Sequence, residues 1–293
     1  MSHAKKSPQY LHLADKWTVQ HREIQKGLWG RHGDVLKKFV DRTKHLAVGA
    51  ASALIMLATP VTAIMNTPVS PIQAEEEKIS GNAFLVSDLF PYIPEQVRPL
   101  TPDEEKVVGQ LLTKHFGFHV AAELDGKRLN RSYGYIGKEQ HLARYPGDNM
   151  GTHFDTPEEA AAHSKEGMAP GLGAYRYFVP SGSEITQKEK DMEKYYIAVQ
   201  TFLAPDYHFR TAEYRDFFKF RKMLLVNPHS GKAMVVVIGD AGPAQWTGKH
   251  LGGSPEVMSY LERVDGRAKG PVLYYFIDDP DDKIPLGPVT VKK

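Results

Sequence analysis

The sequence predicts a mainly β fold with added helices, carried outside a membrane by one N-terminal transmembrane helix. Residues 46–65 form an uncharged, mostly apolar segment that follows a strongly basic stretch. Later in the chain, residues 223–226, 234–238 and 271–277 are short apolar runs bounded by turn-forming residues, which is typical of buried strands. The chain is 41% hydrophobic and 25% charged, as expected of a folded globular body.

Charge is divided unevenly along the 293 residues. Residues 1–44 hold ten Lys and Arg against four Asp and Glu, a net charge of +6, and residues 45–74 hold none of these residue types. Because the whole chain carries only +2, the remainder carries −4, so its charge gives no indication of a nucleic-acid partner. The chain has no cysteine, which excludes disulfides, thiolate metal sites, a thiol nucleophile and a lipoprotein anchor.

The apolar segment at residues 46–65 has the length that a helix needs to cross a bilayer. The basic residues precede it, so the positive-inside rule places the tail, residues 1–44, in the cytoplasm and the body outside. We predict an uncleaved anchor over residues 45–65. The alternatives are a signal peptide cleaved near Ala63 or Ala74, which would release a secreted body, and a buried core helix.

The first part of the exported body divides into a linker, residues 66–100, and a small α+β region, residues 101–166. The linker contains several prolines and polar stretches, with one apolar patch at residues 84–90. In the α+β region, alternating apolar residues predict a strand, and the Asp-Gly dipeptide at residues 125–126 predicts the turn of a hairpin.

Two helices in this region have clear start signals. Thr101 and Thr156 are each followed by Pro at the next position and by Glu three residues later, the pattern of a capping box with Pro at the first helical position. Apolar residues recur with helical spacing after Thr101, so we expect this helix to end at Gly117. The second helix should be short and stop at Gly167.

A polar segment, residues 139–155, separates the two helices. Five of its side chains are potential ligands for a divalent metal ion: Glu139, His141, Asp148, His153 and Asp155. Their spacing matches no zinc motif, so we interpret the segment as a solvated loop and predict neither a metal nor another cofactor. An alternative is one wall of a glycan-binding groove, in which sugar rings would stack on Tyr133, Tyr135 and Tyr145.

The most informative stretch contains two apolar runs, residues 223–226 and 234–238, separated by a turn with the sequence Pro-His-Ser-Gly. These runs predict two adjacent antiparallel strands. The second run ends in Gly-Asp-Ala-Gly-Pro, which places Asp240 directly after a buried strand, a common position for functional side chains. Ser254 and Pro255 then mark the start of a short helix.

This stretch resembles the double-psi β-barrel of the rare-lipoprotein-A, barwin and expansin group. In that group, a strand–turn–strand with Asn and Gly in the turn leads into an Asp followed by Gly-Pro, a glycine-containing loop and a short helix. The matching residues here are Asn227, Gly231, Asp240, Gly242, Pro243, Thr247, Gly248, Lys249, Ser254 and Pro255. The likeness implies a C-terminal six-stranded double-psi β-barrel over residues 167–293. Residues 171–175 resemble the approach to its first strand, and residues 195–202 resemble the following strand.

The chain departs from this group in three places. Lytic members of the group carry a His at the end of the second strand, where this sequence has Gln200. The Asp-Leu-Ser expected before the short helix is replaced by Gly-Gly-Ser at residues 252–254. Residues 204–221 form an aromatic-rich insertion, which we interpret as a helix packed on the barrel, the alternative being a lid that faces a glycan.

The resemblance implies that Asp240 is the catalytic residue of a peptidoglycan lytic transglycosylase. One carboxylic acid protonates the glycosidic oxygen and then accepts a proton from the sugar's own 6-hydroxyl, which closes an anhydro ring without the second carboxylate of ordinary glycosidases. The apolar run at residues 234–238 should raise the pKa of this acid. The side chains expected to bind substrate are Trp246, Lys249, Gln200 and Tyr175. The alternative for Asp240 is a structural acid that accepts backbone N–H bonds in a turn.

We therefore predict an extracytoplasmic cell-wall protein, attached to the membrane through residues 46–65, whose partner is peptidoglycan or another envelope glycan. Lytic transglycosylation is the enzymatic hypothesis. One alternative is a non-catalytic glycan-binding module on the same fold, which Gln200 favours. Another is an envelope scaffold that binds proteins through residues 82–165. The sequence has no Gly-rich phosphate loop followed by Lys and Ser or Thr, and no nucleic-acid partner is predicted.

Overall fold

The structure is a computed structural model that describes residues 81–263 and 270–292, all of which belong to one unit of the chain, residues 69–293. The predicted membrane segment, residues 46–65, lies outside the described residues, as do the basic tail and both candidate cleavage points. Within the described ranges, no helix combines the length and the hydrophobicity that a membrane crossing requires.

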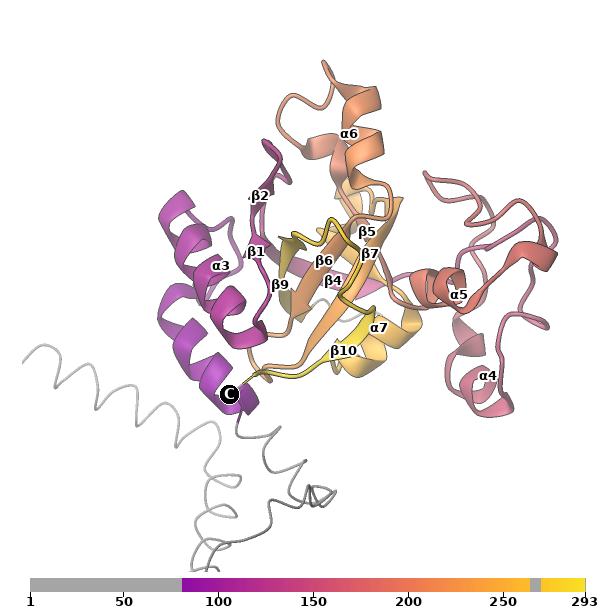
Figure 1. Cartoon of the computed structure of the whole chain (residues 1–293), viewed down its shortest axis with the longest axis horizontal. Helices are drawn as coiled ribbons and strands as arrows, with labels where there is room; N and C mark the ends of the chain where they lie inside the picture. The colour runs from indigo at the N-terminus through magenta and orange to yellow at the C-terminus, as the bar shows by residue number, and fades with distance from the viewer. Residues whose placement is uncertain (1–80, 264–269, 293) are drawn as a thin grey trace, which may run out of the picture. The chain divides into compact units, whose positions relative to one another are not determined.

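Six strands close into a β-barrel, which confirms the predicted barrel with added helices (Figure 1). The strands are β4 (Tyr133–Lys138), β5 (Tyr196–Val199), β6 (Lys222–Val226), β7 (Ala233–Ala241), β8 (Leu251–Gly253) and β9 (Gly270–Ile277). Their hydrogen-bonded order is β9-β4-β8-β5-β7-β6, and β6 pairs with β9 to close the ring. The β4–β8 and β5–β7 pairs are parallel, and the other four pairs are antiparallel. Two short strands, β1 (Val120–Ala121) and β10 (Gly287–Val289), extend the sheet beside β9 and β7.

The barrel takes its first strand, β4, from the segment that the sequence assigned to the small α+β region, residues 101–166. Residues 171–175, which were expected to lead into that first strand, form no strand, although the structure describes this whole stretch. The sequence of β4, Tyr-Gly-Tyr-Ile-Gly-Lys, does not predict a strand, because glycine is unfavourable in strand interiors. The packing explains these glycines, since a Cβ on Gly134 would lie 2.9 Å from the Cβ of His250, and one on Gly137 would lie 2.3 Å from the Cδ of Lys249.

The barrel strands are covered by apolar residues on both faces, which explains their uninterrupted hydrophobic sequences. One buried cluster draws residues from all six strands and therefore fills the barrel interior. A second cluster lies on the outer face and packs against α3 (Pro102–Phe116). Along β9, residues alternate between the interior cluster (Val272, Tyr274 and Phe276) and the outer cluster (Leu273, Tyr275 and Ile277).

The predicted start and end signals are confirmed. The Thr101 hydroxyl accepts a bond from the Glu104 N–H, the Glu104 carboxylate accepts one from the Thr101 N–H, and Gly117 ends α3 with φ of 73°. Thr156 caps α4 (Pro157–His163) through the N–H of Glu159, but the carboxylate of Glu159 pairs with Lys194 and does not complete a capping box. The α-helix ends at His163, and a 3-10 turn carries the chain on to Gly167. Strands β2 (Glu123–Leu124) and β3 (Lys127–Arg128) pair around the predicted Asp-Gly turn, whose two residues have φ of 52° and 67°.

Removal of the α3 cap should have a measurable cost. In Thr101→Ala, the N–H of Glu104 loses its acceptor, and we expect the free energy of unfolding to fall by about 1 kcal/mol. Thr101→Ser keeps the hydroxyl oxygen and should retain most of this stability. Urea unfolding of the three proteins measures the difference, and equal losses in both variants would contradict a capping role.

Residues 81–92, part of the predicted linker, are helical: residues 81–89 form an α-helix that continues into the 3-10 turn η2 (Phe90–Tyr92). Leu85 and Leu89 are fully buried in the outer cluster with α3. The apolar patch at residues 84–90 therefore packs on the folded body. The remaining helical elements are α5 (Gln187–Lys194), α6 (Thr211–Phe218), α7 (Pro255–Tyr260), and the turns η3 (Ser164–Glu166), η4 (Gly182–Glu184), η5 (Thr201–Leu203) and η6 (Gln245–Thr247).

The aromatic insertion at residues 204–221 contains α6, which projects from one end of the barrel (Figure 1). Its side chains Tyr214, Phe217 and Phe218 are buried in the interior cluster. The prediction that this insertion packs on the barrel core is thus confirmed. In the same view α3 lies on one side of the barrel, and α4 and α5 lie on the other (Figure 1).

Candidate functional site

The carboxyl group of Asp240 is fixed at one oxygen and unengaged at the other. Asp240 lies near the end of β7, beside Ala198 of the parallel strand β5. Its Oδ1 accepts bonds from the backbone N–H of Ala174, at 2.6 Å, and of Ala241, at 2.7 Å. No described residue donates to Oδ2. The side chain therefore holds a turn, as one of the two sequence interpretations requires, and still has one oxygen available for chemistry.

The environment of Asp240 favours its protonated form. Burial raises the pKa of this carboxyl above its usual value of 3.8, and the two backbone N–H bonds only partly oppose that effect. A Cβ on Gly173 would lie 3.3 Å from the carboxyl carbon, so a neighbouring chain segment approaches the acid closely. The upward direction of the pKa agrees with the prediction made from the apolar run that precedes Asp240.

Tyr175 lies close to Asp240, but its ring is part of the core. The charge of Asp240 contributes to the raised pKa of the Tyr175 hydroxyl, after the larger effect of burial and that of Tyr207. The ring is buried and packs against Phe220, with ring centroids 6.1 Å apart. The ring itself is therefore not available for stacking on a sugar.

Gln200 supports the loop that follows Asp240. This side chain is buried, and its Nε2 donates to the carbonyl oxygens of Pro243, at 2.9 Å, and Lys249, at 3.2 Å. The backbone adds a further link, because Gly242 N–H donates to the carbonyl of Val199 at the end of β5. Gln200 thus positions the loop of residues 242–249, and both of its amide hydrogens have protein acceptors.

The two other predicted residues lie on this loop. The Nζ of Lys249 donates to Glu139 Oε1, at 2.6 Å, and to the carbonyl of Lys138, at 3.1 Å, so its charge is already paired. Trp246 has 89% of its surface exposed. Among the five predicted site residues, Trp246 therefore offers an exposed ring, and Asp240 offers one carboxylate oxygen that accepts no bond from a described residue.

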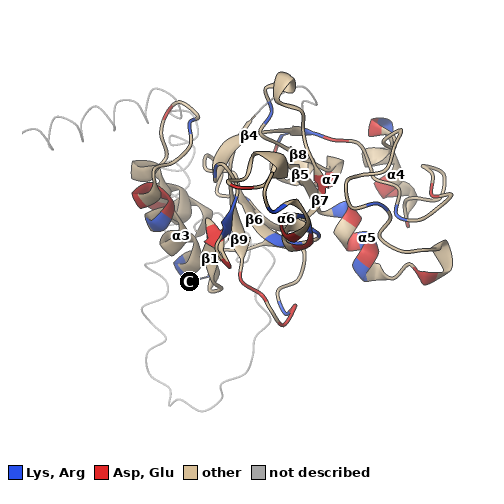
Figure 2. Cartoon of the chain, turned by 90° about the horizontal axis from the view of Figure 1, so that it is seen from above, with Lys and Arg blue, Asp and Glu red and all other residues tan. Residues whose placement is uncertain are grey.

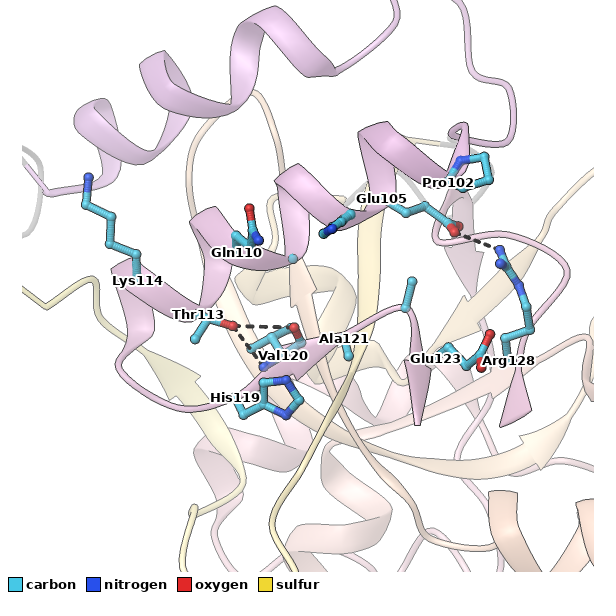
Figure 3. A pocket seen from close by; sticks show the side chains of 13 residues that line it. Pro102, Glu105, Gln110, Thr113, Lys114, His119, Val120, Ala121, Glu123 and Arg128 are labelled. Atoms are coloured by element: carbon cyan, nitrogen blue, oxygen red, sulfur yellow. Dashed lines mark hydrogen bonds and ion pairs between the residues drawn. The ribbon is translucent and has the colours of Figure 1, made fainter. Parts of the chain in front are cut away.

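A cavity of about 590 Å³ lies elsewhere, between α3 and the strands β1 and β3 (Figure 3). None of the five predicted site residues lines it. The buried carboxylate in its wall, Glu105, is occupied by Arg128 Nη2, at 2.7 Å, and by Ser132 Oγ, at 2.6 Å. This acid is therefore held by its neighbours.

The polar segment at residues 139–155 is not the solvated loop that we expected. His141, Asp148 and His153 are buried. Both histidines lie beside Glu193 of α5, and Asp148 contacts His153. The ligand atoms of His141, His153 and Glu193 lie within 4.8 Å of one another, so these side chains can hold a divalent metal ion. Sequence reasoning missed Glu193 because Lys, Asp and Glu alternate along α5, a pattern typical of a solvent-facing helix (Figure 2).

Comparison with known proteins yields no relative: no family model, no curated protein and no solved structure matches this chain. The candidate sites are therefore characterised by the contacts of their own residues.

Proposed function

We propose that this chain is an envelope protein that cleaves peptidoglycan as a lytic transglycosylase, with Asp240 as its acid and base. The observation that carries the proposal is the state of this carboxyl group. One oxygen is held by two backbone N–H groups, the other accepts no bond from a described residue, and burial raises the pKa. The charge pattern around residues 46–65 supports export of the body and attachment to the membrane.

The strand pairings support a double-psi topology for the barrel. Shifting each of its six strands by three positions in chain order exchanges β4 with β7, β5 with β8, and β6 with β9. Under this exchange, the parallel pair β4–β8 becomes the parallel pair β7–β5, and the antiparallel pair β4–β9 becomes β7–β6. The pairs β5–β8 and β6–β9 map onto themselves. A barrel of two equivalent, interlocked halves has this two-fold relation.

In the proposed reaction a single carboxyl group acts twice. Protonated Asp240 donates its proton to the glycosidic oxygen while the bond from that oxygen to the sugar's C1 breaks. The resulting carboxylate then accepts the proton of the 6-hydroxyl of the same sugar, whose oxygen bonds to C1 and closes the anhydro ring. The enzyme finishes in its starting protonation state, and no water is consumed. The Oδ1 bonds to Ala174 and Ala241 keep the group in place throughout.

The pH dependence of cleavage tests this role. The first step needs the acid form, whose population falls as pH rises through the pKa of Asp240 in the folded protein. Because burial raises that pKa above 3.8, activity should extend to higher pH than an ordinary aspartic acid allows and then decline as pH rises further. Initial rates of release of soluble muropeptides across the pH range measure this. A rate that increases steadily with pH would contradict the proposal.

The second candidate is a glycan-binding module without catalysis. It is favoured by Gln200, whose amide is committed to the carbonyls of Pro243 and Lys249 and cannot act as the His of the lytic members of the resembled group would. The exposed ring of Trp246 would then stack on a sugar. Co-sedimentation of the full chain with insoluble peptidoglycan, without release of soluble products, supports this candidate. In that case Trp246→Ala should weaken the retention.

A further inference from the structure

Three buried side chains from two separate segments of the chain converge at α5. His141 and His153 come from the polar segment after β4, and Glu193 comes from the last turn of α5. Their side chains are 0%, 3% and 3% exposed. Buried ionisable groups are costly unless they are paired or coordinate an ion, so this cluster requires an explanation.

The two ring nitrogens of His153 face two different carboxylates. Its Nδ1 lies 3.2 Å from Asp148 Oδ2, and its Nε2 lies 2.8 Å from Glu193 Oε2. Asp148 is itself fixed by Arg144, whose Nε and Nη2 lie 2.8 Å and 3.1 Å from the two carboxylate oxygens. A carboxylate that accepts the far N–H of a histidine sets the tautomer in which the other nitrogen faces a metal.

His141 carries a nitrogen without a hydrogen bond. Its Nε2 lies 3.4 Å from the carbonyl oxygen of His163, which is the position of an acceptor for an Nε2–H. Its buried Nδ1 has no hydrogen-bond partner and lies 3.4 Å from Glu193 Oε1. With the proton on Nε2, a lone pair on Nδ1 faces a carboxylate oxygen, an unfavourable arrangement that a cation between the two atoms would relieve.

Glu256, at the start of α7, provides the second unpartnered buried atom. Its Oε2 is buried and accepts no hydrogen bond. The helix that carries it, α7, packs against α5, which carries Glu193, so the group lies beside the cluster. A buried oxygen that accepts no bond from the described residues can accept one from a water on a bound metal ion.

We propose that His141 Nδ1, His153 Nε2 and the carboxylate of Glu193 bind a divalent transition-metal ion of the zinc class, and that Glu256 accepts a hydrogen bond from a water in the fourth position. Two imidazoles with one carboxylate is a recurrent ligand set for Zn²⁺, whereas Mg²⁺ and Ca²⁺ prefer oxygen ligands throughout. Ligands at about 2.1 Å from a tetrahedral ion lie about 3.4 Å apart. In the structure His153 Nε2 lies 2.8 Å from Glu193 Oε2, His141 Nδ1 lies 3.4 Å from Glu193 Oε1, and all the ligand atoms lie within 4.8 Å of one another. Binding would therefore draw the side chains to a common spacing around the ion.

The site would fasten the long stretch between β4 and β5 to the barrel. That stretch has little apolar support, since the nearby cluster of buried residues consists of Leu142, Met192, Tyr196 and Val237. The chain has no cysteine and so no disulfide to hold it. A metal ion would add a constraint here by linking the segment after β4 to α5.

Metal content and thermal stability of the full chain, prepared without an affinity tag and stripped with a chelator, test the proposal. After the stripped protein is incubated with Zn²⁺ and desalted, we expect it to retain one Zn²⁺ per chain, measured by elemental analysis. Zn²⁺ in about 100-fold excess over its dissociation constant should raise the melting temperature by about 5–10 °C, and Mg²⁺ and Ca²⁺ should not. Co²⁺ in place of Zn²⁺ should give the visible absorption of a four-coordinate site. Wild-type protein that retains no Zn²⁺ and shows no shift would overturn the proposal.

Variants separate this site from the other histidines, of which the chain has 13 in all. Glu193→Gln should abolish stoichiometric retention, and Glu256→Gln should weaken Zn²⁺ binding by about 10–100-fold. The matched control is His115→Gln, which removes another buried histidine, paired with Asp88 at 2.8 Å, and should bind Zn²⁺ as the wild type does. Binding that is unchanged in Glu193→Gln would assign the metal to another part of the chain. Activity on peptidoglycan is not used as a readout, so the outcome is independent of the role of Asp240.

Discussion

Replacement of Asp240 by asparagine is expected to lower the rate of anhydro-muropeptide release by about 10²–10⁴-fold, the contribution typical of a general acid–base group. Asparagine keeps an oxygen that can accept the N–H bonds of Ala174 and Ala241, so the turn should survive. It lacks the transferable proton on which both steps depend. Rates of release from purified peptidoglycan, measured at the pH of highest wild-type activity, give the ratio.

A matched control and a folding check accompany this variant. Asp216→Asn removes an exposed carboxylate on α6 and should leave the rate unchanged. The pKa of Asp240 is raised in the folded state, so its stabilising effect is present at low pH and is lost as pH rises through that pKa. Asp240→Asn should therefore melt at the same temperature as the wild type at neutral pH, or slightly higher. Undiminished cleavage by folded Asp240→Asn would leave this residue with a structural role alone.

The largest expected effect on stability is that of Phe218→Ala. Phe218 is fully buried on α6 and packs against Phe276 of β9, with ring centroids 6.2 Å apart. Truncation removes most of the side chain and leaves a cavity that the surrounding barrel cannot fill. We expect the free energy of unfolding to fall by about 3–5 kcal/mol. Equilibrium urea unfolding, with a lower midpoint at an unchanged slope, measures the loss.

Phe209→Ala is the control for this prediction. Phe209 belongs to the same insertion but has 89% of its surface exposed, so its removal should change the free energy of unfolding by no more than about 0.5 kcal/mol. The comparison distinguishes a helix that completes the barrel core from a lid held loosely above it. Similar, small losses in both variants would favour the lid.

Local signals in the sequence predicted the elements that they govern. The caps at Thr101, Thr156 and Ser254 each bond a backbone N–H within the first turn of their helices. The runs at residues 223–226 and 234–238 pair as β6 and β7 around the expected turn. These features depend on residues that are neighbours in the chain, so their chemistry can be read directly from spacing.

Features that depend on contacts between distant parts of the chain could not be predicted from the local sequence. The first barrel strand, β4, has glycines because residues more than 100 positions later, His250 and Lys249, approach its backbone. The buried cluster joins His141 and His153 to Glu193, on a helix whose other residues are mostly charged. The sequence identified the two histidines as potential ligands, but only the fold shows that Glu193 lies beside them.

The candidate catalytic site was predicted in part. The apolar run before Asp240 correctly indicated burial and a raised pKa. The sequence did not indicate that Tyr175 would be a core residue, or that Lys249 would pair with Glu139, because both depend on packing between separate segments. The role of Gln200 as a support for the loop at residues 242–249 likewise follows from two long-range bonds.

Digestion of purified peptidoglycan by the full chain in H₂¹⁸O, with the soluble products examined by mass spectrometry, decides whether the Asp240 site is a lytic transglycosylase. Closure of the ring by the sugar's own 6-hydroxyl consumes no water, so the products should be anhydro-muropeptides that contain no ¹⁸O at C1. Products that carry ¹⁸O at C1 would show hydrolysis instead. Absence of any product, with the protein retained on the polymer, would contradict catalysis and leave a glycan-binding module.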